Sequence, residues 1–552
     1  GDDSYSVLFR MPTQALQIHG GAGNDTIILD QINLGSASLE MSAESISQAA
    51  DGSLRSDADI KLLAMSSLSG DLDASNADAA ANALLDIAGS ISAGGQLQLS
   101  AISATEFTQS AADDQTINDL AGLSQFAWSS HALIDIDGAA KLNAEQLQLS
   151  AVTDNLARLE SSGAPLDFSL NLAQSARTLV GSGALLQTSA EADPLKPSMV
   201  LEAIDRTSLI AAQSPSDSAV VHNATLDAAH FELDLSRLAE VVIGASDSRT
   251  TLNAGDDGRV WINAAVLDGL NAGVQTQIDS PITGAIDTQI SEIARALLDN
   301  TALSAADASL FAAAHTHYSS EAKRAQQTLD GEVSAVLQGG SVTLSGDLQV
   351  VAVDSTGLSS NADSWLGDDT DLATGMLPLL AQNAFNRDLQ AHIVDATIAA
   401  GEVLVVGLSL PVLHAQTGEV DATPSDTTST AMVQGALALN QLTGSVSADV
   451  RGSQVLTTGG TGGDISIQAT QAAELTAQGG AGHQQGSDEL ARQGASVALN
   501  LVGWDLPVFD LSDLSALLAP LAEDLANPVV VRAEANGSML QAGRDIAIHA
   551  QE

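Results

Sequence analysis

The chain has 552 residues, with 19 Lys or Arg against 69 Asp or Glu, so its formal net charge is −50 and its pI is near 4.1. This charge excludes a general affinity for nucleic acid or for anionic membranes. A hydrophobic fraction of 45% with only 16% charged residues excludes a disordered acidic tail, because enough apolar material is present to offset the entropy cost of folding. The few aromatic residues (3%) favour a thin core of small stacked layers.

Cysteine is absent, which excludes disulfides, thiolate catalysis and Cys-based zinc sites. This absence fits giant exported bacterial proteins that cross an oxidising compartment before they fold. The sequence shows no signal peptide and no apolar run long enough to span a bilayer. We expect the chain to be a segment of a longer protein.

The first motif in chain order is a Gly-rich corner. Residues 20–28 read Gly-Gly-Ala-Gly-Asn-Asp-Thr-Ile-Ile and match the nonapeptide G-G-x-G-x-D-x-U-x, whose turn carbonyls and Asp bind calcium. Gly21, Gly23 and Asp25 are therefore candidate calcium ligands. A single nonapeptide supplies only half of a ligand set, so the alternative is a corner followed by a strand over 26–29.

A short repeat gives the strongest signal. Residues 96–101 read Gln-Leu-Gln-Leu-Ser-Ala, residues 146–151 repeat the same six, and looser copies occupy 464–469 and 545–550. Apolar residues alternate with polar or small ones in each copy, as in a strand with one buried face. Leu97, Leu99 and Ala101 are predicted to point inward.

Two further strand-like segments precede each copy. A short strand and a small-residue corner lie at 91–95, 142–145 and 540–544, and an earlier strand lies at 83–89, 132–138, 392–396, 446–452 and 531–537. Three strands separated by corners form one rung of a parallel β-helix. The expected fold is therefore all-β with minor α: a right-handed parallel β-helix (β-solenoid) with helical and loop insertions.

Apolar spacing divides the chain further. Residues such as Gln289, Ile293 and Leu297 recur at helical spacing, and so do those of 511–525 and, less clearly, 372–389. We therefore expect six regions, which follow in chain order. They are a solenoid start with the nonapeptide (1–75), rungs with loop excursions (76–282), a helical insertion (283–330), rungs with an insertion near 366–390 (331–508), a second helical insertion (509–527) and a terminal rung (528–552).

A second candidate cation site consists of Asp135 and Asp137, which fall on one face of a predicted strand. They would bind a cation if a carboxylate of a neighbouring rung faced them; the alternative is a set of solvated acidic turns. His315 and His317 would diverge on a helix and cannot share a metal. The four Trp residues are expected to have mainly structural roles.

Common catalytic motifs are missing: there is no H-E-x-x-H, no G-x-S-x-G, and no phosphate or dinucleotide fingerprint. Arg206, Arg259, Arg451 and Arg544 stand apart in sequence, so no carboxylate and arginine pairing of a sugar-cleaving site is visible. We expect a protein that is not an enzyme, with no catalytic residue to name. Stacking of rungs could still assemble a site that the sequence does not show.

The nonapeptide, together with the corner, strand and closing Ala of 93–101, 462–469 and 542–550 and the stretch 495–505, resembles two groups of giant bacterial surface proteins. These are the repeats-in-toxin type adhesins and the filamentous-haemagglutinin-like exoproteins. The resemblance covers most of the chain as a style of repeat. It departs from the first group in one respect, because the nonapeptide occurs once instead of in a long array.

The resemblance implies an exported, elongated segment on the bacterial cell surface, which acts as an adhesive or structural stalk or fibre. The expected partners are the rest of the parent chain or further copies stacked end to end, and glycans or another cell surface, without nucleic acid or membrane insertion. Calcium is the one cofactor implied. The alternatives are a glycan-binding module and a polysaccharide-degrading β-helix enzyme.

Overall fold

The structure is a computed structural model that describes residues 3–7, 15–21, 23–71, 78–110, 125–161, 168–189, 197–213, 230–245, 248–267, 282–362, 365–366, 379–418, 420–421, 434–458, 463–480, 494–504 and 527–552. Throughout these residues the secondary structure is β-strand, and no helix occurs among them. Every pairing between the named strands is parallel, in one sheet of 25 strands, one of 12 and one of two.

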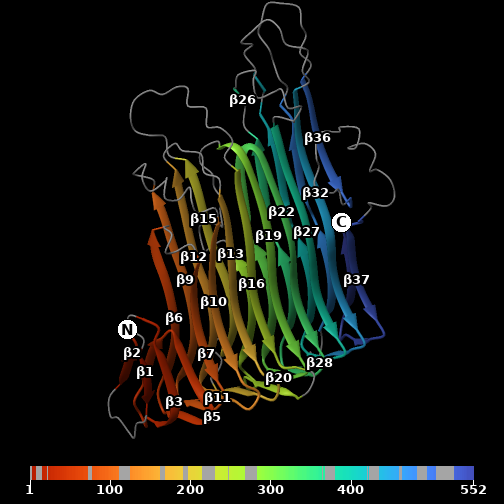
Figure 1. The fold of residues 1–552 in the computed structure, drawn as a ribbon. Coiled ribbons are helices and arrows are strands. Elements are labelled where there is room, and N and C mark those ends of the chain that lie inside the picture. The colour runs from red at the N-terminus through yellow and green to blue at the C-terminus, as the bar shows by residue number, and fades with distance from the viewer. Residues whose placement is uncertain are drawn as a thin grey trace, which may run out of the picture.

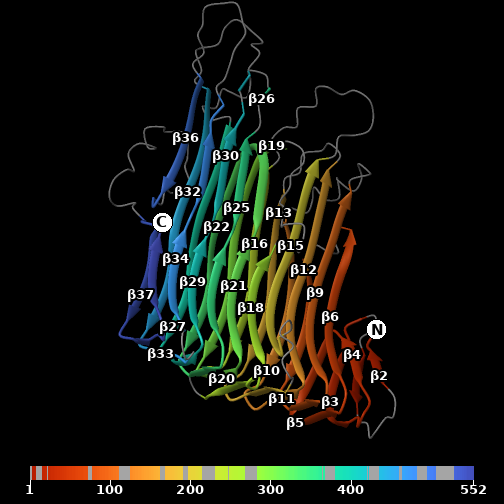
Figure 2. The ribbon, with the colours of Figure 1, turned by 180° about the vertical axis from the view of Figure 1, so that it is seen from behind.

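Each rung contains a first long strand, a short base strand and a second long strand. The base strands lie together at the lower edge in Figure 1, and the second long strands face the viewer in Figure 2. The two sets of long strands thus form opposing walls, and the base strands join them. The predicted order of three strands and two corners is confirmed, and the fold is a parallel β-solenoid.

The first wall belongs to the 25-stranded sheet. Its long strands are β7 (Asp78–Ile87), β10 (Gln125–Ile136), β13 (Phe168–Val180), β16 (His230–Ile243), β19 (Ile282–Asp299), β22 (His317–Gln338), β27 (Leu379–Val394), β32 (Gln434–Arg451) and β37 (Val530–Asn536). The base strands of the same sheet are β8 (Ser90–Ala93), β11 (Lys141–Ala144), β14 (Leu185–Thr188), β17 (Thr250–Asn253), β20 (Thr301–Ala305), β23 (Ser341–Leu344), β28 (Thr397–Ala400), β33 (Gln454–Thr457) and β38 (Met539–Gln541).

The 12-stranded sheet is the second wall. Its strands are β2 (Leu16–His19), β4 (Leu39–Ala43), β6 (Ile60–Asp71), β9 (Gln96–Ser110), β12 (Gln146–Ser161), β15 (Met199–Gln213), β18 (Arg259–Leu267), β21 (Asp307–His315), β24 (Leu348–Asp354), β29 (Val403–Ser409), β34 (Ile465–Gln471) and β39 (Ile546–Gln551).

The remaining strands begin or extend the walls. They are β1 (Ser4–Val7), β3 (Thr26–Asn33), β5 (Ser45–Ser56), β25 (Gly357–Ala362), β26 (Trp365–Leu366), β30 (Val412–Thr417), β31 (Val420–Asp421), β35 (Glu474–Gln478) and β36 (Gly494–Val502).

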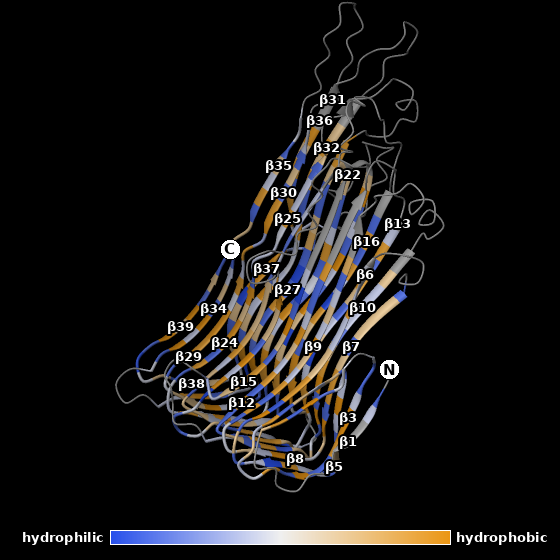
Figure 3. Cartoon of the chain, turned by 90° about the vertical axis from the view of Figure 1, so that its left-hand side faces the viewer, coloured by the Kyte–Doolittle hydropathy of each residue, from blue (hydrophilic) through white to orange (hydrophobic). Residues whose placement is uncertain are grey.

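The repeated hexapeptides stack directly on one another. Leu97 pairs with Leu147 and Leu99 with Leu149, each in the same register, and the looser copies pair Ile465 with Ile546. Leu97, Leu99 and Ala101 are fully buried, as predicted. Identical sequence in adjacent rungs therefore places identical side chains in one column of the core. The alternation of hydrophobic and hydrophilic residues along the long strands is visible in Figure 3.

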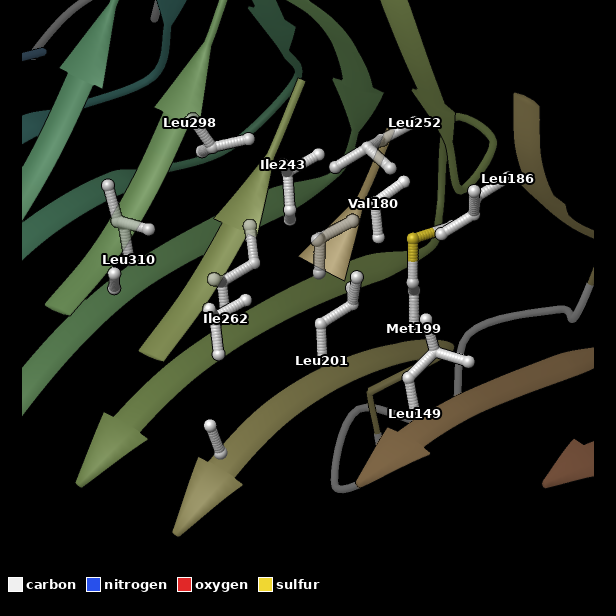
Figure 4. Close-up of a cluster of buried hydrophobic side chains, with 14 of the residues drawn as sticks. Leu149, Val180, Leu186, Met199, Leu201, Ile243, Leu252, Ile262, Leu298 and Leu310 are labelled. Atoms are coloured by element: carbon white, nitrogen blue, oxygen red, sulfur yellow. The ribbon is translucent and has the colours of Figure 1, made fainter. Parts of the chain in front are cut away.

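Two main apolar clusters fill the interior. The larger one lies near the base strands, where Leu149, Leu201 and Ile262 of the second wall meet Val180 and Ile243 of the first (Figure 4). The other lies farther from the base and contains most of the buried aromatic residues, including Phe107 and Trp128. Residues between the two clusters are polar, and they are described below.

The helical insertion expected at 283–330 is wrong. These residues form β19, β20, β21 and much of β22. Residues Ile290, Ala294 and Leu298 point into the core with the period of a strand, whereas Ile293 and Leu297 lie on the outer face, half-buried. Apolar residues on both faces of one strand imitate the spacing of an amphipathic helix.

The insertion near 366–390 is corrected in part, because β27 occupies 379–394 as a regular rung strand. Residues 367–378 lie outside the described residues, and so does almost all of the helical insertion expected at 509–527. The terminal rung expected at 528–552 is observed as β37, β38 and β39.

The first rungs have the roughly 20–30 residues of a compact β-helix coil, since Leu39 pairs with Ile60 only 21 positions later, but the later rungs are much longer. Leu348 pairs with Ala308, 40 positions earlier, and Ile546 pairs with Ile465, 81 positions earlier. Twelve strands spaced about 4.8 Å apart make a stack of roughly 50 Å, while an 18-residue strand such as β19 spans about 60 Å across it. The described part of this segment is therefore about as broad as it is long.

Candidate functional site

A layer of buried polar side chains separates the two apolar clusters; we call it the polar belt. On the first wall it runs through one column of paired residues: Ser130, Gln174, Arg237, Glu292, Gly331 and Arg387. On the second wall it runs through Ser103, Thr153, Asp205, Asp354 and Ser409. The belt forms because strand β16 presents Leu235, then Arg237, then Ala239 to the interior, and its neighbours follow the same order.

Arg237 is the centre of the belt and is 1% exposed. Its Nε donates to Asp205 Oδ2 at 2.8 Å, and its Nη1 lies 3.4 Å from Glu292 Oε1. The same Nη1 donates to the Tyr318 hydroxyl at 3.0 Å, and Nη2 donates to the backbone oxygens of Asp205 and Leu267. The guanidinium therefore joins the two walls across the interior.

Arg387 is the second buried guanidinium. Its Nη2 donates to Glu292 Oε2, and its Nη1 lies 3.4 Å from Asp354 Oδ1. Glu292 thus lies between two arginines and also accepts a hydrogen bond from the Tyr318 hydroxyl. Two guanidinium groups and three carboxylates alternate along the belt, so like charges are not stacked directly on one another.

Gly331 makes this arrangement possible. It occupies the column position between Glu292 and Arg387, because Glu292 pairs with Gly331 and Gly331 with Arg387. A Cβ at position 331 would lie 2.6 Å from the Glu292 carbonyl oxygen and 3.3 Å from Arg387 Cζ. Any other residue would occupy the space through which Arg387 reaches a carboxylate two rungs away.

Burial and neighbouring charges shift the pKa values of the belt residues in opposite directions. Burial alone raises the pKa of Glu292, but Arg387 and Arg237 outweigh it and hold that pKa below its ordinary value. Burial raises the pKa of Asp354 and prevails over the opposing effect of Arg387. Burial also raises the pKa of Tyr318 well above its ordinary value. The two arginines therefore favour the ionised form of Glu292, whereas burial disfavours the ionised form of Asp354.

Hydrogen-bonded amides extend the interior network farther from the base. Asn383 Nδ2 donates to Asn440 Oδ1 at 2.9 Å, and Asn440 Nδ2 donates to Asn500 Oδ1 at 2.9 Å. Asn383 and Asn440 also donate to carbonyl oxygens of the strands that face them. This Asn ladder fixes the register of three consecutive rungs, because a shift of one residue would move every amide to the outer face.

A second ionic cluster lies on the outer face of the first wall near its last rung. Asp449 Oδ2 accepts from Arg532 Nη2 at 2.8 Å and from Arg451 Nη2, and it lies 3.3 Å from His392 Nε2. Burial lowers the pKa of His392, and Asp449 opposes that shift. Glu534 lies 3.8 Å from both arginines. Positive and negative groups balance here, so the cluster offers no uncompensated charge to a ligand.

The predicted calcium residues lie at a corner that precedes β3. Gly21 and Gly23 have φ angles of 105° and 126°, which only glycine adopts readily. Asp25 is 1% exposed; its Oδ1 accepts from the Asp3 backbone N–H at 3.0 Å, and its own N–H donates to Glu44 Oε2 at 2.8 Å. The second carboxylate oxygen of Asp25 is buried and has no hydrogen-bond partner among the described residues.

The second predicted cation site gains a third carboxylate from the next rung. Asp135 pairs directly with Asp86, so a carboxylate of a neighbouring rung does face it. Burial raises the pKa of Asp135, and Asp86 and then Asp137 raise it further. Asp86, Asp135 and Asp137 thus repel one another on the outer face of the first wall, and calcium binding to them stays a prediction. Within the described residues, no group of three or more His, Asp or Glu is arranged to hold a metal ion.

Two of the four Trp residues have distinct surroundings. Trp128 is 3% exposed and stacks on Phe107 with ring centroids 4.1 Å apart, so its structural role is confirmed. Trp261 differs, because it lies on the outer face of the second wall and is 48% exposed. His315 and His317 lie on strands, where burial lowers the pKa of His317 and His315 Nδ1 bonds the Ser355 hydroxyl.

No family model, no curated protein and no solved structure matches this chain. In the part of the chain that the structure describes, no helix has the length and apolar character needed to cross a membrane.

Sequence reasoning missed the whole polar belt. Arg237, Glu292 and Arg387 are separated by dozens of residues, and only the stacking of rungs brings them together. A local signal did exist, because each interrupts a run of alternating apolar residues at an inward position. Arg451 and Arg544, two of the arginines that stand apart in the sequence, form ion pairs with Asp449 and Asp464 and lie outside the belt.

Two belt substitutions are expected to have opposite pH dependences. Glu292→Gln should lower the free energy of unfolding by about 3–5 kcal/mol at pH 7, because it leaves two buried guanidinium groups short of an anion. This difference in unfolding free energy between wild type and variant should shrink below about pH 4. Glu292 has a lower pKa in the folded state than in the unfolded chain, so the stability that its charge contributes is lost as the pH falls and the carboxylate takes up a proton.

Asp354→Asn should behave differently. The raised pKa of Asp354 means that its ionisation destabilises the folded state as pH rises above about 4, so the variant should gain stability relative to the wild type between pH 4 and pH 7. Urea unfolding followed by circular dichroism across this range measures both. Parallel pH profiles for the two variants would contradict this account of the belt.

Proposed function

We propose that this chain is a structural and adhesive segment of an exported surface protein, in which stacked rungs form part of a stalk or fibre on the bacterial cell surface. The observation that carries the proposal is the continuous parallel ladder of the second wall, which runs through twelve strands from β2 to β39. Such a ladder gains stability from each neighbouring rung, so its length can grow without a new core.

The last rung supports association end to end with further copies or with the rest of a parent chain. Core-facing positions that are buried in the preceding rung are open in this one: Ile465 and Ile467 are fully buried, whereas Ile546 and Ile548 are 47% and 46% exposed. On the base strand of the same rung, Leu540 pairs with the fully buried Val455 and is itself only half-buried. An apolar layer beside an unpaired strand edge is a surface on which another rung can stack.

Replacement of this layer should abolish end-to-end association. We expect the wild-type chain to form linear oligomers as concentration rises, and Ile546→Lys with Ile548→Lys to remain unassociated, because charges would enter the stacked core. Negative-stain imaging and sedimentation velocity report the result. A matched control is Ser236→Lys with Ser291→Lys, which places two lysines on exposed, paired positions of the first wall. Linear oligomers that persist in the Ile546 and Ile548 variant would contradict the proposal.

Calcium is proposed as a stabilising ion at the first corner, bound by the Asp25 carboxylate and the loop carbonyls of Gly21 and Gly23. The buried, unpartnered oxygen of Asp25 supports this proposal, since a carboxylate oxygen without a donor is suited to a cation. Calcium that binds only the folded state should raise the melting temperature.

The calcium proposal is tested by melting in millimolar calcium and in chelator. The wild type should melt several degrees higher with calcium, and Asp25→Asn should lose this difference, whereas Asp51→Asn, an exposed acid on β5, should keep it. A transition that does not respond to calcium in the wild type would exclude a structural ion at this corner.

Glycan binding is the second candidate function, and the exposure of Trp261 favours it. An indole on a flat sheet face can stack on a sugar ring, and Ser309 and Asn263 lie beside it as polar neighbours. A glycan array should then show signals that Trp261→Ala removes and that an aromatic replacement, Trp261→Phe, keeps in part. Signals unaffected by Trp261→Ala would place any glycan site elsewhere. The ionic cluster at Asp449 gives no support to polysaccharide cleavage, because its positive and negative groups balance one another.

A further inference from the structure

We infer that the outer face of the second wall binds a second copy of this chain, face to face. This contact is separate from the end-to-end contact of the terminal rung and does not depend on it. The surface consists of side chains that alternate with the core residues along β12, β15, β18, β21, β24 and β29. Its defining residues, which we call the apolar face, are Val152, Phe311, Val351, Val353, Val406 and Leu408.

The apolar face is built by stacking, because outward positions pair in register in the same way as core positions. Val351 pairs with Phe311 and with Val406, and Val353 pairs with Leu408. Each of these side chains is half-buried, although none belongs to a core cluster. On β21, β24 and β29, two adjacent columns of mostly branched or aromatic side chains therefore cover the outside of the sheet, and Leu410, 37% exposed, continues the surface beyond β29.

Charge is nearly absent from this face. Three outward columns across the six strands comprise eighteen described positions, and Glu202 is the one charged residue among them, although the chain carries 88 charged residues in 552. Two molecules of net charge −50 repel each other across most of their surfaces. Across the apolar face a second copy would meet one acidic residue, Glu202, and therefore little of this repulsion, which favours a second copy as the occupant.

The area is sufficient for a specific dimer. Six strands about 4.8 Å apart and three columns about 6.8 Å apart cover roughly 600 Å² per molecule. Two copies related by a two-fold axis would bury roughly 1,200 Å² in total, the lower end of the range for specific interfaces. Two flat sheets can pack about 10 Å apart with interdigitating side chains, as the sheets of a β-sandwich do. Twelve of the eighteen positions are apolar, and a contiguous apolar surface of a few hundred Å² is often an interaction site.

The test compares two pairs of charge substitutions by light scattering coupled to size exclusion, at about 10 μM protein and in 0.1 and 0.5 M salt. The wild type should have the mass of a dimer, and it should do so more completely at high salt, because salt screens the repulsion. Val351→Lys with Val406→Lys should reduce the mass to that of a monomer with an unchanged circular dichroism spectrum. Ser236→Lys with Ser291→Lys, on exposed positions of the first wall, should leave the dimer intact.

The absence of cysteine allows a direct check of the contact. A single Val353→Cys should be crosslinked into dimers by a short bismaleimide, whereas a single Ser291→Cys should not. A monomeric wild type, or a dimer that survives Val351→Lys with Val406→Lys, overturns the inference. A dimer that is instead lost in the Ile546→Lys and Ile548→Lys variant also overturns it but leaves the end-to-end proposal intact. A monomer that binds glycans through this face would likewise overturn it.

Discussion

In-register parallel stacking is the constraint on which the rest of the structure depends. Each residue of a long strand lies beside the residue of the same column in the next rung, about 4.8 Å away, so the chemistry of one rung restricts the next. Apolar columns such as Leu97 to Leu147 gain from this repetition, whereas a column of like charges would accumulate repulsion. Asp86 beside Asp135 shows the cost, since the neighbouring carboxylates add to the raised pKa of Asp135.

The polar belt obeys the same constraint inside the solenoid. A buried ion has to meet an opposite charge, and the partners available are the rungs above and below and the facing wall. Arg237 uses both, because it pairs with Glu292 in its own wall and with Asp205 across the interior. Gly331 leaves the gap through which Arg387 reaches the same Glu292. Backbone pairing connects each rung only to its immediate neighbours. The side chains of the belt couple several rungs at once.

The sequence predicted the elements that repeat and missed those that depend on stacking. The hexapeptides at 96–101 and 146–151 identified the strands, their inward faces and the three-strand rung, since period two is visible within a few residues. The interval between rungs along the second wall varies from 21 to 81 residues, so no fixed period could align Arg237 with Glu292 or Arg387. The mistaken helix at 283–330 has a related cause, because Ile293 and Leu297 are apolar on the outer face.

The outer faces of the two walls differ in the charge that their columns of paired residues carry. On the first wall, Arg177, Glu240 and Arg295 alternate in sign across three rungs, with Arg177 Nε 2.9 Å from Glu240 Oε2, so charge is accommodated there by pairing. On the second wall, the columns through Val351 and Val353 hold almost no charge to pair. A solenoid that carries a net charge of −50 and still keeps almost all charge off one broad face offers a like molecule a direction of approach with little repulsion. Stacking along the axis and packing across that face then act at right angles, so rungs that lengthen a fibre would also enlarge the face that joins two fibres.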